Sequence, residues 1–590
     1  MIEYSMKKIY KSDARSVKKL GLNLGSMMLI WLLLSCTSEK FPDTGVNTEM
    51  GWKPELVCPS DEGCADVEGA LLFAGASAKI ITPTCFESWE DLDDDEQYKS
   101  SQDVFFDCGC DRICPEDEGY ITPDLGEGDG DFQAIWLAGY GSARPAEAVH
   151  DDLWARTIVL EQGETTWALV SVDLVGFFND DLNQLRERAD AEGLDFDHIT
   201  ITSTHVHSGP DTLGQWGRRA GETGRNQEYL LYLENQIIAS LAEASATLQE
   251  TNMKIGSIDT STYSPEKGSR NMIHDHRDPK IIDPILNVAS FENNSGETIA
   301  TLLNFANHPE VLTRFYITSD FVDQTRVGVE NGITYPAYSV DGVGGVCIYI
   351  SGALGGMMSP LRVDVTDGSG EEFSSNGFPK SEALGRVMAE LALEALGSAV
   401  EMPDPKISFS KHSFSVPLEN ILFQAGFLSG MFEREIENYE DGEMLTDDKI
   451  PLIATEINLI EIGSLRMQTV PGELLPELAI GGYDSLEQPH TTLEVMVGEE
   501  NPNPPELSQA PEGPYLLERI GGEYNWIIGL GNDELGYFIP TYNYKLDDRT
   551  PYFEEAEGDH YEETNSLGPS AYPVIEEELN RLLDWKHAND

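Results

Sequence analysis

Two histidines separated by one residue follow a short β-branched segment of the chain. His205 and His207 lie in the stretch Ser203-Thr-His-Val-His-Ser-Gly-Pro210, directly after His198–Thr202, which we expect to form a strand. Residues two apart in an extended backbone share a face, so both imidazoles can point into one site. Imidazole nitrogens bind metals and transfer protons, although histidines at this spacing also occur on protein surfaces.

Three further segments end in residues that could complete such a site. His308 follows an apolar run in Asn304–Pro309, Glu473 follows a Pro-Gly turn, and Tyr537 ends the glycine-rich stretch Gly529–Tyr537. The glycines of the last stretch permit close backbone approach. Taken singly, His308 is better explained as a capping or core histidine and Glu473 as an exposed turn carboxylate, and Tyr537 can be a packed aromatic ring.

Together with Ser359-Pro360, these segments resemble the motifs of the neutral, non-lysosomal ceramidases. That family has Thr-His-x-His-Ser-Gly-Pro, His-Pro, Ser-Pro, Pro-Gly-Glu and Gly-Leu-x-Asn-x-x-x-x-Tyr elements, and all five occur here in order between Thr204 and Tyr537. The resemblance extends over residues 71–585. It implies a zinc-dependent hydrolase of linear amide C–N bonds that acts in sphingolipid metabolism. The implied substrate is ceramide or a related lipid amide, and the products are a fatty acid and an amine.

Carried over by position, the resemblance implies that His205, His308, Glu473 and Tyr537 hold the zinc ion. Two imidazoles and one carboxylate are a familiar catalytic zinc set, whereas the tyrosine ligand is implied by the family alone. Zinc lowers the pKa of its bound water toward ~7, which provides the attacking hydroxide.

The resemblance also implies a set of residues near the substrate. His207 is the expected general acid for the leaving amine. His207, Arg270 or Tyr537 would stabilise the oxyanion, and Tyr561 matches a further tyrosine beside the substrate. Ser359 matches a serine of the family, and with zinc present we expect a structural or substrate-contact role for it rather than a nucleophilic one.

The chain departs from the family pattern in ways that leave alternatives open. The sequence Gly355-Gly-Met-Met-Ser359 lacks the aspartate that usually precedes this serine, and no immunoglobulin-like module is expected in the 29 residues after Tyr561. Because loops determine the shape of a pocket, one alternative is a zinc hydrolase of another amide or of an ester. The other is a non-catalytic, ceramidase-like surface binding protein.

The elements that must position these residues alternate between strands and helices. Strands are expected at Leu71–Ile81, Trp154–Leu160, Trp167–Leu174, His198–Thr202, Pro284–Phe291, Ile299–Phe305, Val346–Ile350, Ile407–Val416, Thr455–Ile462 and Leu465–Val470. Helices are expected at Asp180–Ala191, Gln227–Leu248, Glu382–Leu396 and Val574–Trp585. This pattern indicates a large mixed α/β catalytic domain with central sheets flanked by helices and the zinc site at strand ends.

Residues 1–35 are expected to be a lipoprotein signal peptide. A basic segment precedes a short apolar run that ends in Leu33-Leu-Ser-Cys36, which resembles a lipobox. The run is shorter than the ~20 apolar residues of a spanning helix, and an uncleaved anchor is the alternative. A lipid on Cys36 would make the protein an exported, membrane-anchored lipoprotein. Because Thr37 follows the cysteine, we expect it on the outer membrane or cell surface.

The rest of the chain divides into a tether at 36–70 and the catalytic domain at 71–590. The domain carries a cysteine-rich acidic insertion at 85–132 and a proline-rich loop at 501–514. Six cysteines in an exported chain indicate three disulfides, and a zinc site formed by the last three is the alternative. These cysteines are Cys58, Cys64, Cys85, Cys108, Cys110 and Cys114.

Acidic residues dominate the composition of the chain. The 590 residues include 38 Lys and Arg against 104 Asp and Glu, a net charge of -66. This excludes nucleic-acid binding, which needs basic surfaces, and electrostatic docking on anionic lipid. In the insertion, Asp91, Asp93 and Asp95 alternate, and we expect either a calcium site or a solvated acidic loop.

Overall fold

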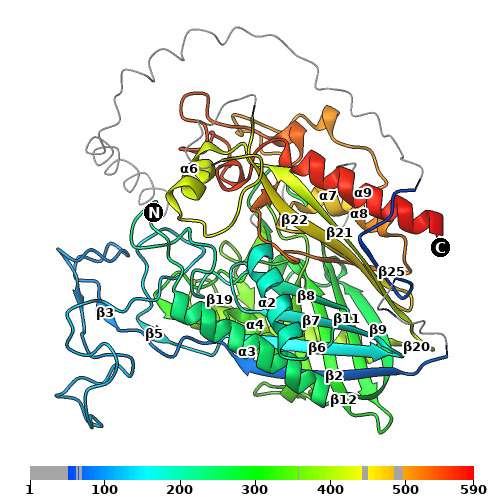
Figure 1. Ribbon diagram of the computed structural model, residues 1–590, viewed down its shortest axis with the longest axis horizontal. Coiled ribbons are helices and arrows are strands. Elements are labelled where there is room, and N and C mark those ends of the chain that lie inside the picture. The colour runs from blue at the N-terminus through cyan, green and yellow to red at the C-terminus, as the bar shows by residue number, and fades with distance from the viewer. Residues whose placement is uncertain are drawn as a thin grey trace. The chain divides into compact units, whose positions relative to one another are not determined.

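Two β-sheets packed face to face form the centre of the computed structural model (Figure 1). The structure describes residues 51–61, 64, 69–356, 358–440, 449–483 and 496–589. In these residues the larger sheet has nine strands and the smaller sheet has five. The two sheets and the helices outside them belong to one unit that begins at Lys53.

The nine-stranded sheet is mixed. The pairs β7–β8 and β12–β16 are parallel, and the other pairs are antiparallel. In spatial order its strands are β16 (Val346–Ser351), β12 (Thr298–Phe305), β11 (Ile285–Asn293), β9 (Gln249–Asp259), β2 (Leu72–Ile80), β6 (Trp154–Gln162), β7 (Thr165–Val172) and β8 (His198–Ser203), with β20 (Val400–Met402) also on β9. Strands β6 and β7 form a hairpin around Gly163 and pair from Gln162↔Thr165 onward.

The five-stranded sheet covers one face of the larger sheet. Its strands are β1 (Leu56–Cys58), β21 (Ile407–Pro417), β22 (Leu452–Ile462), β23 (Leu465–Thr469) and β25 (Tyr524–Ile528). A buried apolar core that includes Trp167 and Trp526 lies between the sheets. Strand β1 belongs to the segment predicted as a tether, so part of that segment is built into this sheet.

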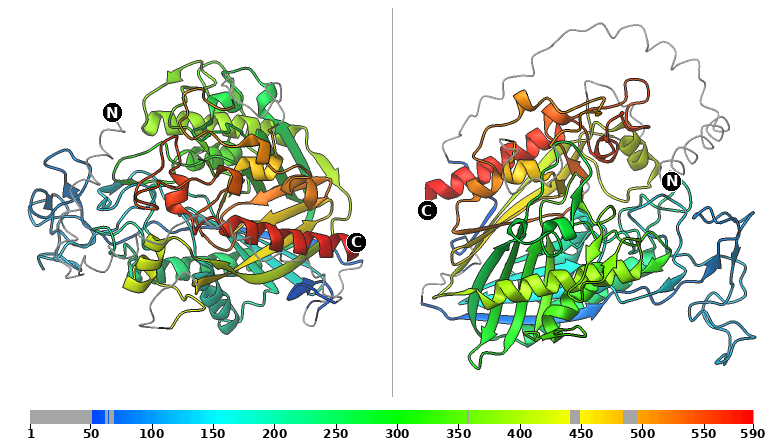
Figure 2. Two further views of the ribbon diagram at one scale, coloured as in Figure 1. Left: turned by 90° about the horizontal axis from the view of Figure 1, so that it is seen from above. Right: turned by 180° about the vertical axis from the view of Figure 1, so that it is seen from behind.

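Helices cover the outer faces of both sheets. On the nine-stranded sheet they are α2 (Asn179–Ala191), α3 (Gln227–Ala246), α4 (Phe321–Asn331) and α5 (Phe378–Gly397). Figure 2 shows α5 across the strands in the view from behind. Helices α8 (Leu516–Ile520) and α9 (Ala571–Asn589) lie on the smaller sheet, and α9 is joined to β21 by His412 and Glu578. The predicted α/β fold with flanked sheets is confirmed.

Alternate residues of one strand serve the two cores. In β6, Ile158 and Leu160 face the inter-sheet core, while Ala155 and Val159 face the helices. This two-sided burial accounts for the almost continuous apolar composition of the strand, as expected for a sheet covered on both faces.

Short elements complete the described chain. The short helices are α6 (Ile421–Ser429) and α7 (Pro476–Ile480). The short strands are β3 (Trp89–Glu90), β4 (Val104–Phe105), β5 (Ala148–Val149), β10 (His274–Asp275), β13 (Tyr316–Ile317), β14 (Ile333–Thr334), β15 (Ser339–Val340), β17 (Met358–Ser359), β18 (Val365–Thr366), β19 (Glu372–Phe373), β24 (Glu473–Leu474) and β26 (Tyr537–Phe538).

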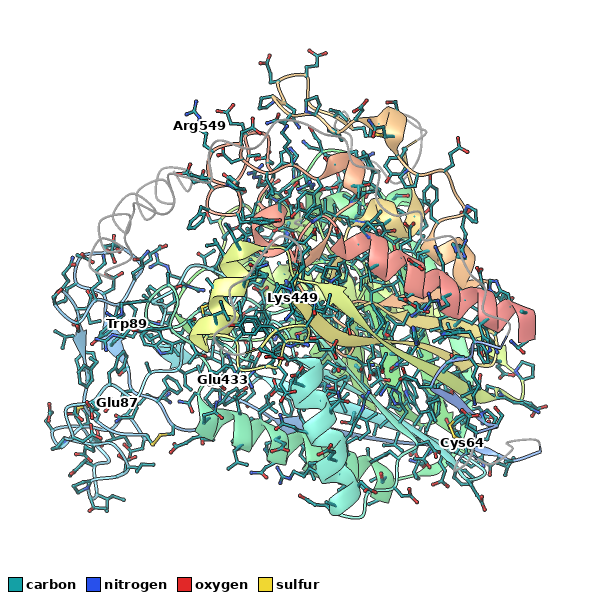
Figure 3. The ribbon with its side chains drawn as sticks, turned by 45° about the horizontal axis from the view of Figure 1, so that its top comes forward. Cys64, Glu87, Trp89, Glu433, Lys449 and Arg549 are labelled. Atoms are coloured by element: carbon teal, nitrogen blue, oxygen red, sulfur yellow. A yellow bond between two sulfur atoms is a disulfide. The ribbon has the colours of Figure 1, made fainter. Side chains whose placement is uncertain are left out.

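The cysteine-rich insertion is a separate lobe beside the sheets, where Figure 3 labels Glu87 and Trp89. Its ring cluster of Trp89 and Tyr98 packs on Phe315. The six cysteines form three disulfides, as predicted, so the alternative of a cysteine zinc site is wrong. The pairs are Cys58–Cys64, Cys85–Cys110 and Cys108–Cys114.

The acidic run of the insertion gives no support to the predicted calcium site. Asp91, Asp93 and Asp95 lie close together, but their oxygens already accept hydrogen bonds within the loop. Asp91 accepts from the backbone N–H groups of Asp94 and Glu96, each at 2.9 Å. The alternative of a solvated acidic loop fits these contacts.

No helix in the described part of the chain combines the length and apolar character needed to cross a bilayer. The predicted signal peptide and Cys36 lie outside the described residues.

Candidate metal centre

Four strand ends meet at one place in the two-sheet fold. β8 leads into His205 and His207, and β12 leads into His308. Across from them, β23 leads into Glu473 and β25 leads into Tyr537. The short strands β24 and β26 pair in parallel with Glu473 opposite Tyr537. Segments far apart in sequence therefore bring these five side chains together.

Backbone hydrogen bonds hold each of these residues in place. The N–H of His205 donates to Leu174 O at 3.0 Å, and the N–H of His308 donates to Met358 O at 2.8 Å. The N–H of Glu473 donates to Gly536 O at 3.0 Å. His205 has a φ of +68°, which is uncommon for a residue other than glycine. This left-handed turn ends the strand and directs the imidazole inward.

The three histidines and Glu473 are buried and close together. The ring centroids of His205 and His308 are 4.8 Å apart, and those of His205 and His207 are 4.9 Å apart. The Nε2 atoms of His205 and His308 lie 3.3 and 3.0 Å from Oε2 of Glu473. One ring nitrogen from each of the three histidines falls within 4.8 Å of the others.

Backbone carbonyls determine which ring nitrogens carry protons. Nδ1 of His205 lies 2.7 Å from Val175 O, and Nδ1 of His308 lies 3.2 Å from Met358 O. A carbonyl only accepts, so each Nδ1 donates, and in the neutral rings each Nε2 presents a lone pair to the Glu473 carboxylate. Three electron-pair donors thus face one another. A divalent cation among them satisfies all three, and the set fits zinc.

Without a bound cation, a proton on one of these side chains must supply the positive charge that faces Glu473. Burial lowers the pKa of His308, but its hydrogen bond with Glu473 and the nearby Glu310 raise that pKa overall. Burial raises the pKa of Glu473, but His205 and His308 lower it overall to far below the usual range. The centre is therefore built for positive charge.

Five of the predicted site residues line one pocket, namely His205, His207, Glu473, Tyr537 and Tyr561. The Tyr537 and Tyr561 rings are 6.2 Å apart. Burial and the neighbouring Glu473 raise the pKa of Tyr537 well above 10. A zinc ligand role for this phenol therefore requires the cation itself to offset both effects.

Two predicted residues lie elsewhere. Arg270 is exposed in a short 3-10 helix, Ser269–Asn271, and is not among the residues that line the pocket. Ser359 is buried in β17, where its Oγ accepts a hydrogen bond from the N–H of Leu361 at 3.1 Å. The structure therefore does not bring Arg270 to the site. Ser359 is buried and is not among the residues that line the pocket.

The remaining walls of the pocket are mostly apolar and aromatic. Helix α6 contributes Phe423 and Phe427, and the loop after it contributes Phe432. Other apolar lining residues are Val175, Phe178, Leu213, Trp216, Ile453, Leu535 and Leu567. Mostly apolar walls with a few buried polar groups are typical of pockets that bind small molecules.

Sequence reasoning missed three charged residues at this site. Glu310 is buried beside His207, and Glu534 lines the pocket within the glycine-rich stretch. Arg434 also lines the pocket, and its guanidinium is held by Asp533. Only Glu534 lies inside a motif, so sequence alone offered no indication of the other two.

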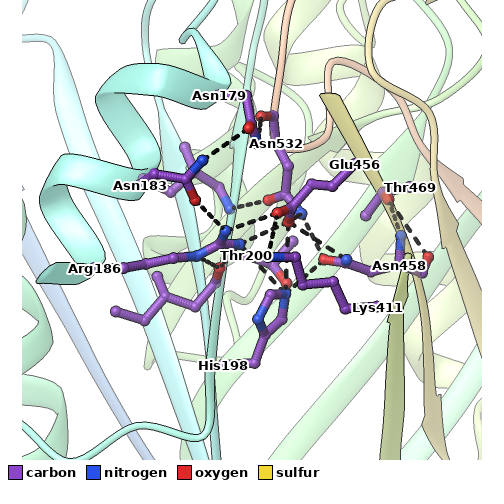
Figure 4. A network of polar contacts seen from close by, with 12 residues as sticks. Asn179, Asn183, Arg186, His198, Thr200, Lys411, Glu456, Asn458, Thr469 and Asn532 are labelled. Carbon is purple, nitrogen blue, oxygen red and sulfur yellow. Dashed lines mark hydrogen bonds and ion pairs between the residues drawn. The ribbon is translucent and has the colours of Figure 1, made fainter. Parts of the chain in front are cut away.

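A buried polar network joins two of the segments that carry the centre (Figure 4). Asn532 accepts a hydrogen bond from the N–H of Ile201 at 2.9 Å and donates to Glu456 Oε1 at 2.8 Å. Glu456 is bound by both Nη atoms of Arg186 at 2.8 Å. The network therefore fastens β8, just before His205, to the loop that carries Tyr537.

The fold and the site define an α/β protein of two stacked sheets with a buried imidazole and carboxylate centre at strand ends. Among solved structures, it is similar to the neutral ceramidase from Pseudomonas aeruginosa, with a TM-score of 0.54 and 17% identity over 87% of this chain and 74% of that one. It is also similar to a ceramidase complexed with C2, with a TM-score of 0.55 and 16% identity over 88% and 76%.

These likenesses show that the chain has the fold of those ceramidases. No protein-family model and no curated protein matches the sequence.

Proposed function

We propose that the protein is a zinc-dependent amidohydrolase that cleaves the N-acyl amide of ceramide or a related lipid. The observation that carries the proposal is the convergence of two imidazole Nε2 lone pairs on Glu473 at an apolar pocket. The fold shared with ceramidases, one of them complexed with C2, supports a lipid amide as the substrate class.

The proposed zinc ligands are His205, His308, Glu473 and Tyr537. Zinc bound in such a set lowers the pKa of a water ligand toward ~7 and so supplies hydroxide near neutral pH. The backbone carbonyls that fix the tautomers of His205 and His308 keep both Nε2 atoms available for the ion. The third imidazole, that of His207, has a ring nitrogen within 4.8 Å of one nitrogen from each of His205 and His308.

The chain's own residues would bind, orient and protonate the substrate. The rings of α6 and its neighbours receive the apolar chain, and the buried centre keeps bulk water from the amide. Burial, reinforced by His205 and His308, lowers the pKa of His207 well below 6.5, so this imidazole begins the reaction neutral. We assign to His207 the proton that finally reaches the leaving amine, and to Tyr561 a hydrogen bond to the carbonyl oxygen.

We further propose that the protein is exported and held at the outer membrane by a lipid on Cys36. The three disulfides support an oxidising location. Substitution Cys36→Ser is expected to move the protein from the membrane fraction to the soluble fraction of the cells that produce it. Unchanged partition between the two fractions would contradict the anchor.

The function is tested by hydrolysis of an N-acylsphingosine by the purified chain, assayed with a chelator, without it, and after zinc is restored. We expect fatty-acid release that the chelator abolishes and zinc recovers. His205→Ala should remove both stoichiometric zinc and turnover. His587→Ala, which changes a histidine of α9 outside the pocket, is the matched control and should keep both.

Other outcomes decide between the alternatives. Stoichiometric zinc without release of fatty acid would redirect the search to other amides and to esters. If the chain bound no zinc and released no fatty acid, the hydrolase proposal would be rejected, and a surface binding protein would remain.

A further inference from the structure

The carboxylate of Glu310 lies against the imidazole of His207 at the base of the pocket. Its Oε2 is 3.5 Å from Nδ1 of His207, and only 1% of the Glu310 residue is exposed. In the part of the chain that the structure describes, neither carboxylate oxygen and neither ring nitrogen of His207 makes a hydrogen bond of ordinary geometry. A buried carboxylate and a buried imidazole are costly to leave unpaired. The two groups are in contact, and the Ser359 hydroxyl lies beside the same carboxylate.

The backbone holds Glu310 in this position. Its N–H donates to His308 O at 3.0 Å, and its carbonyl accepts a hydrogen bond from the Tyr140 hydroxyl at 2.5 Å. The Tyr140 ring packs edge-on against His207, with the centroids 5.2 Å apart. The N–H of His207 donates to Pro309 O at 3.1 Å. The His207 and Glu310 segments are thus fastened together on both sides of the side-chain contact.

We propose that Glu310 is the positioning residue for His207. Its carboxylate accepts the Nδ1–H of His207, fixes that tautomer, and leaves the Nε2 lone pair for the pocket. The proposal rests on the proposed amide hydrolysis, and it assigns a residue to that reaction which no sequence motif indicates.

The proton balance of the reaction follows from this tautomer. The attacking water gives one of its protons to Nε2 of His207 and, as the resulting hydroxide, forms the C–O bond. As the C–N bond breaks, the same proton passes from Nε2 to the amine nitrogen. Glu310 takes no proton; it stabilises the imidazolium between the two transfers, as a carboxylate does for histidine in hydrolytic triads.

The test compares Glu310→Gln and Glu310→Asp with the wild-type chain. For the glutamine variant we expect kcat to fall by about 10²- to 10⁴-fold, with KM within about threefold and zinc content unchanged. The aspartate variant keeps the charge and should recover part of kcat. Glu330→Gln, which removes a carboxylate paired with Arg156 outside the pocket, is the matched control.

A second measurement needs no turnover and so separates this proposal from the proposed function. In the chain labelled with ¹⁵N-histidine, His207 is assigned by the signal lost in His207→Gln. We expect a protonated Nδ1 and an unprotonated Nε2 in the wild type, and loss of that preference in Glu310→Gln. If the wild type hydrolyses no N-acylsphingosine, the proposed function fails while this spectrum still decides the role of Glu310.

Three results would overturn the proposal. They are a wild-type His207 protonated on Nε2, a kcat in Glu310→Gln within about threefold of wild type, and a loss of zinc in that variant, which would make Glu310 a ligand. If Glu310→Gln does not fold, the wild-type spectrum and the aspartate variant decide.

Discussion

Close packing around His207 limits what each neighbouring residue can be. Gly139 lies directly against it with a φ of +93°, and a Cβ at this position would come within 2.3 Å of His207 Cγ and 2.7 Å of its Cα. Such a distance is too short for real atoms, so the histidine or the loop must move. Because the Cα of His207 is among the contacted atoms, a simple change of rotamer cannot relieve the clash.

If His207 acts in the proposed amide hydrolysis, Gly139→Ala is expected to lower kcat by about 10²-fold, the effect of a displacement of ~1 Å at a catalytic group. Gly141→Ala is the matched control, because a Cβ there meets nothing within 4 Å. Initial rates at saturating substrate provide the measurement. Equal rates for the two variants would show that His207 does not act in the reaction.

At the residue scale, the sequence motifs led to side chains that do lie together. His205, His308, Glu473 and Tyr537 were chosen by motif and meet at one centre. Glu310 was not found, because a single buried carboxylate has no sequence pattern and its partner is known only from tertiary structure. Arg270 also matched by position, yet its helix turn places it in solvent.

At the scale of elements, segments with strong hydrophobic periodicity can be predicted from the sequence, whereas segments with weak periodicity cannot. The predicted strands at β2, β6, β7, β8, β11, β12, β16 and β21–β23 are present within a few residues. Strand β9 was missed because only Met253 and Ile255 alternate as apolar residues in a polar stretch. Helix α4 was missed because Val322, Val329 and Thr325 are poor helix formers; packing against α5 stabilises it.

The order of the strands was beyond sequence reasoning for a different reason. Neighbours such as β2 and β9, or β23 and β25, are separated by long stretches of chain. Which distant strands pair depends on which strand edges and apolar faces are still exposed after the other strands have paired. No local sequence pattern carries this information.

Asn532 links two distant elements, strand β8 and the loop that carries Tyr537. Its substitution should therefore destabilise both. Asn532→Ala removes the bonds to Ile201 and Glu456 and leaves the buried N–H of Ile201 unpaired, at a cost of about 1–3 kcal/mol. We expect a clearly lower midpoint of urea unfolding and weaker zinc binding. Asn183→Ala, on the exposed side of the same network in α2, should change the midpoint little. Equal shifts for the two variants would contradict a linking role for Asn532.

At the scale of the whole molecule, the charge of -66 opposes compact folding. Like charges in a folded chain repel one another, and salt screens this repulsion over a Debye length of ~10 Å at 0.1 M. Salt also weakens surface ion pairs such as Lys53–Asp61, but each of these contributes little. The net effect of salt is therefore stabilising.

We expect the thermal unfolding midpoint to rise by several degrees between 0.05 and 1 M NaCl. Calorimetry or circular dichroism measures it, and sucrose at matched osmolality serves as the control for solute exclusion. A midpoint that falls with salt would show that local ion pairs outweigh the global repulsion.

The centre draws its side chains from both sheets, and this determines when it can exist during synthesis. His205 and His308 follow strands of the nine-stranded sheet, whereas Glu473 and Tyr537 follow strands of the smaller one. Tyr537 is separated from His205 by most of the folded chain, so a growing polypeptide cannot assemble the centre until nearly all of it has emerged. A complete centre therefore requires that both sheets have folded and packed together.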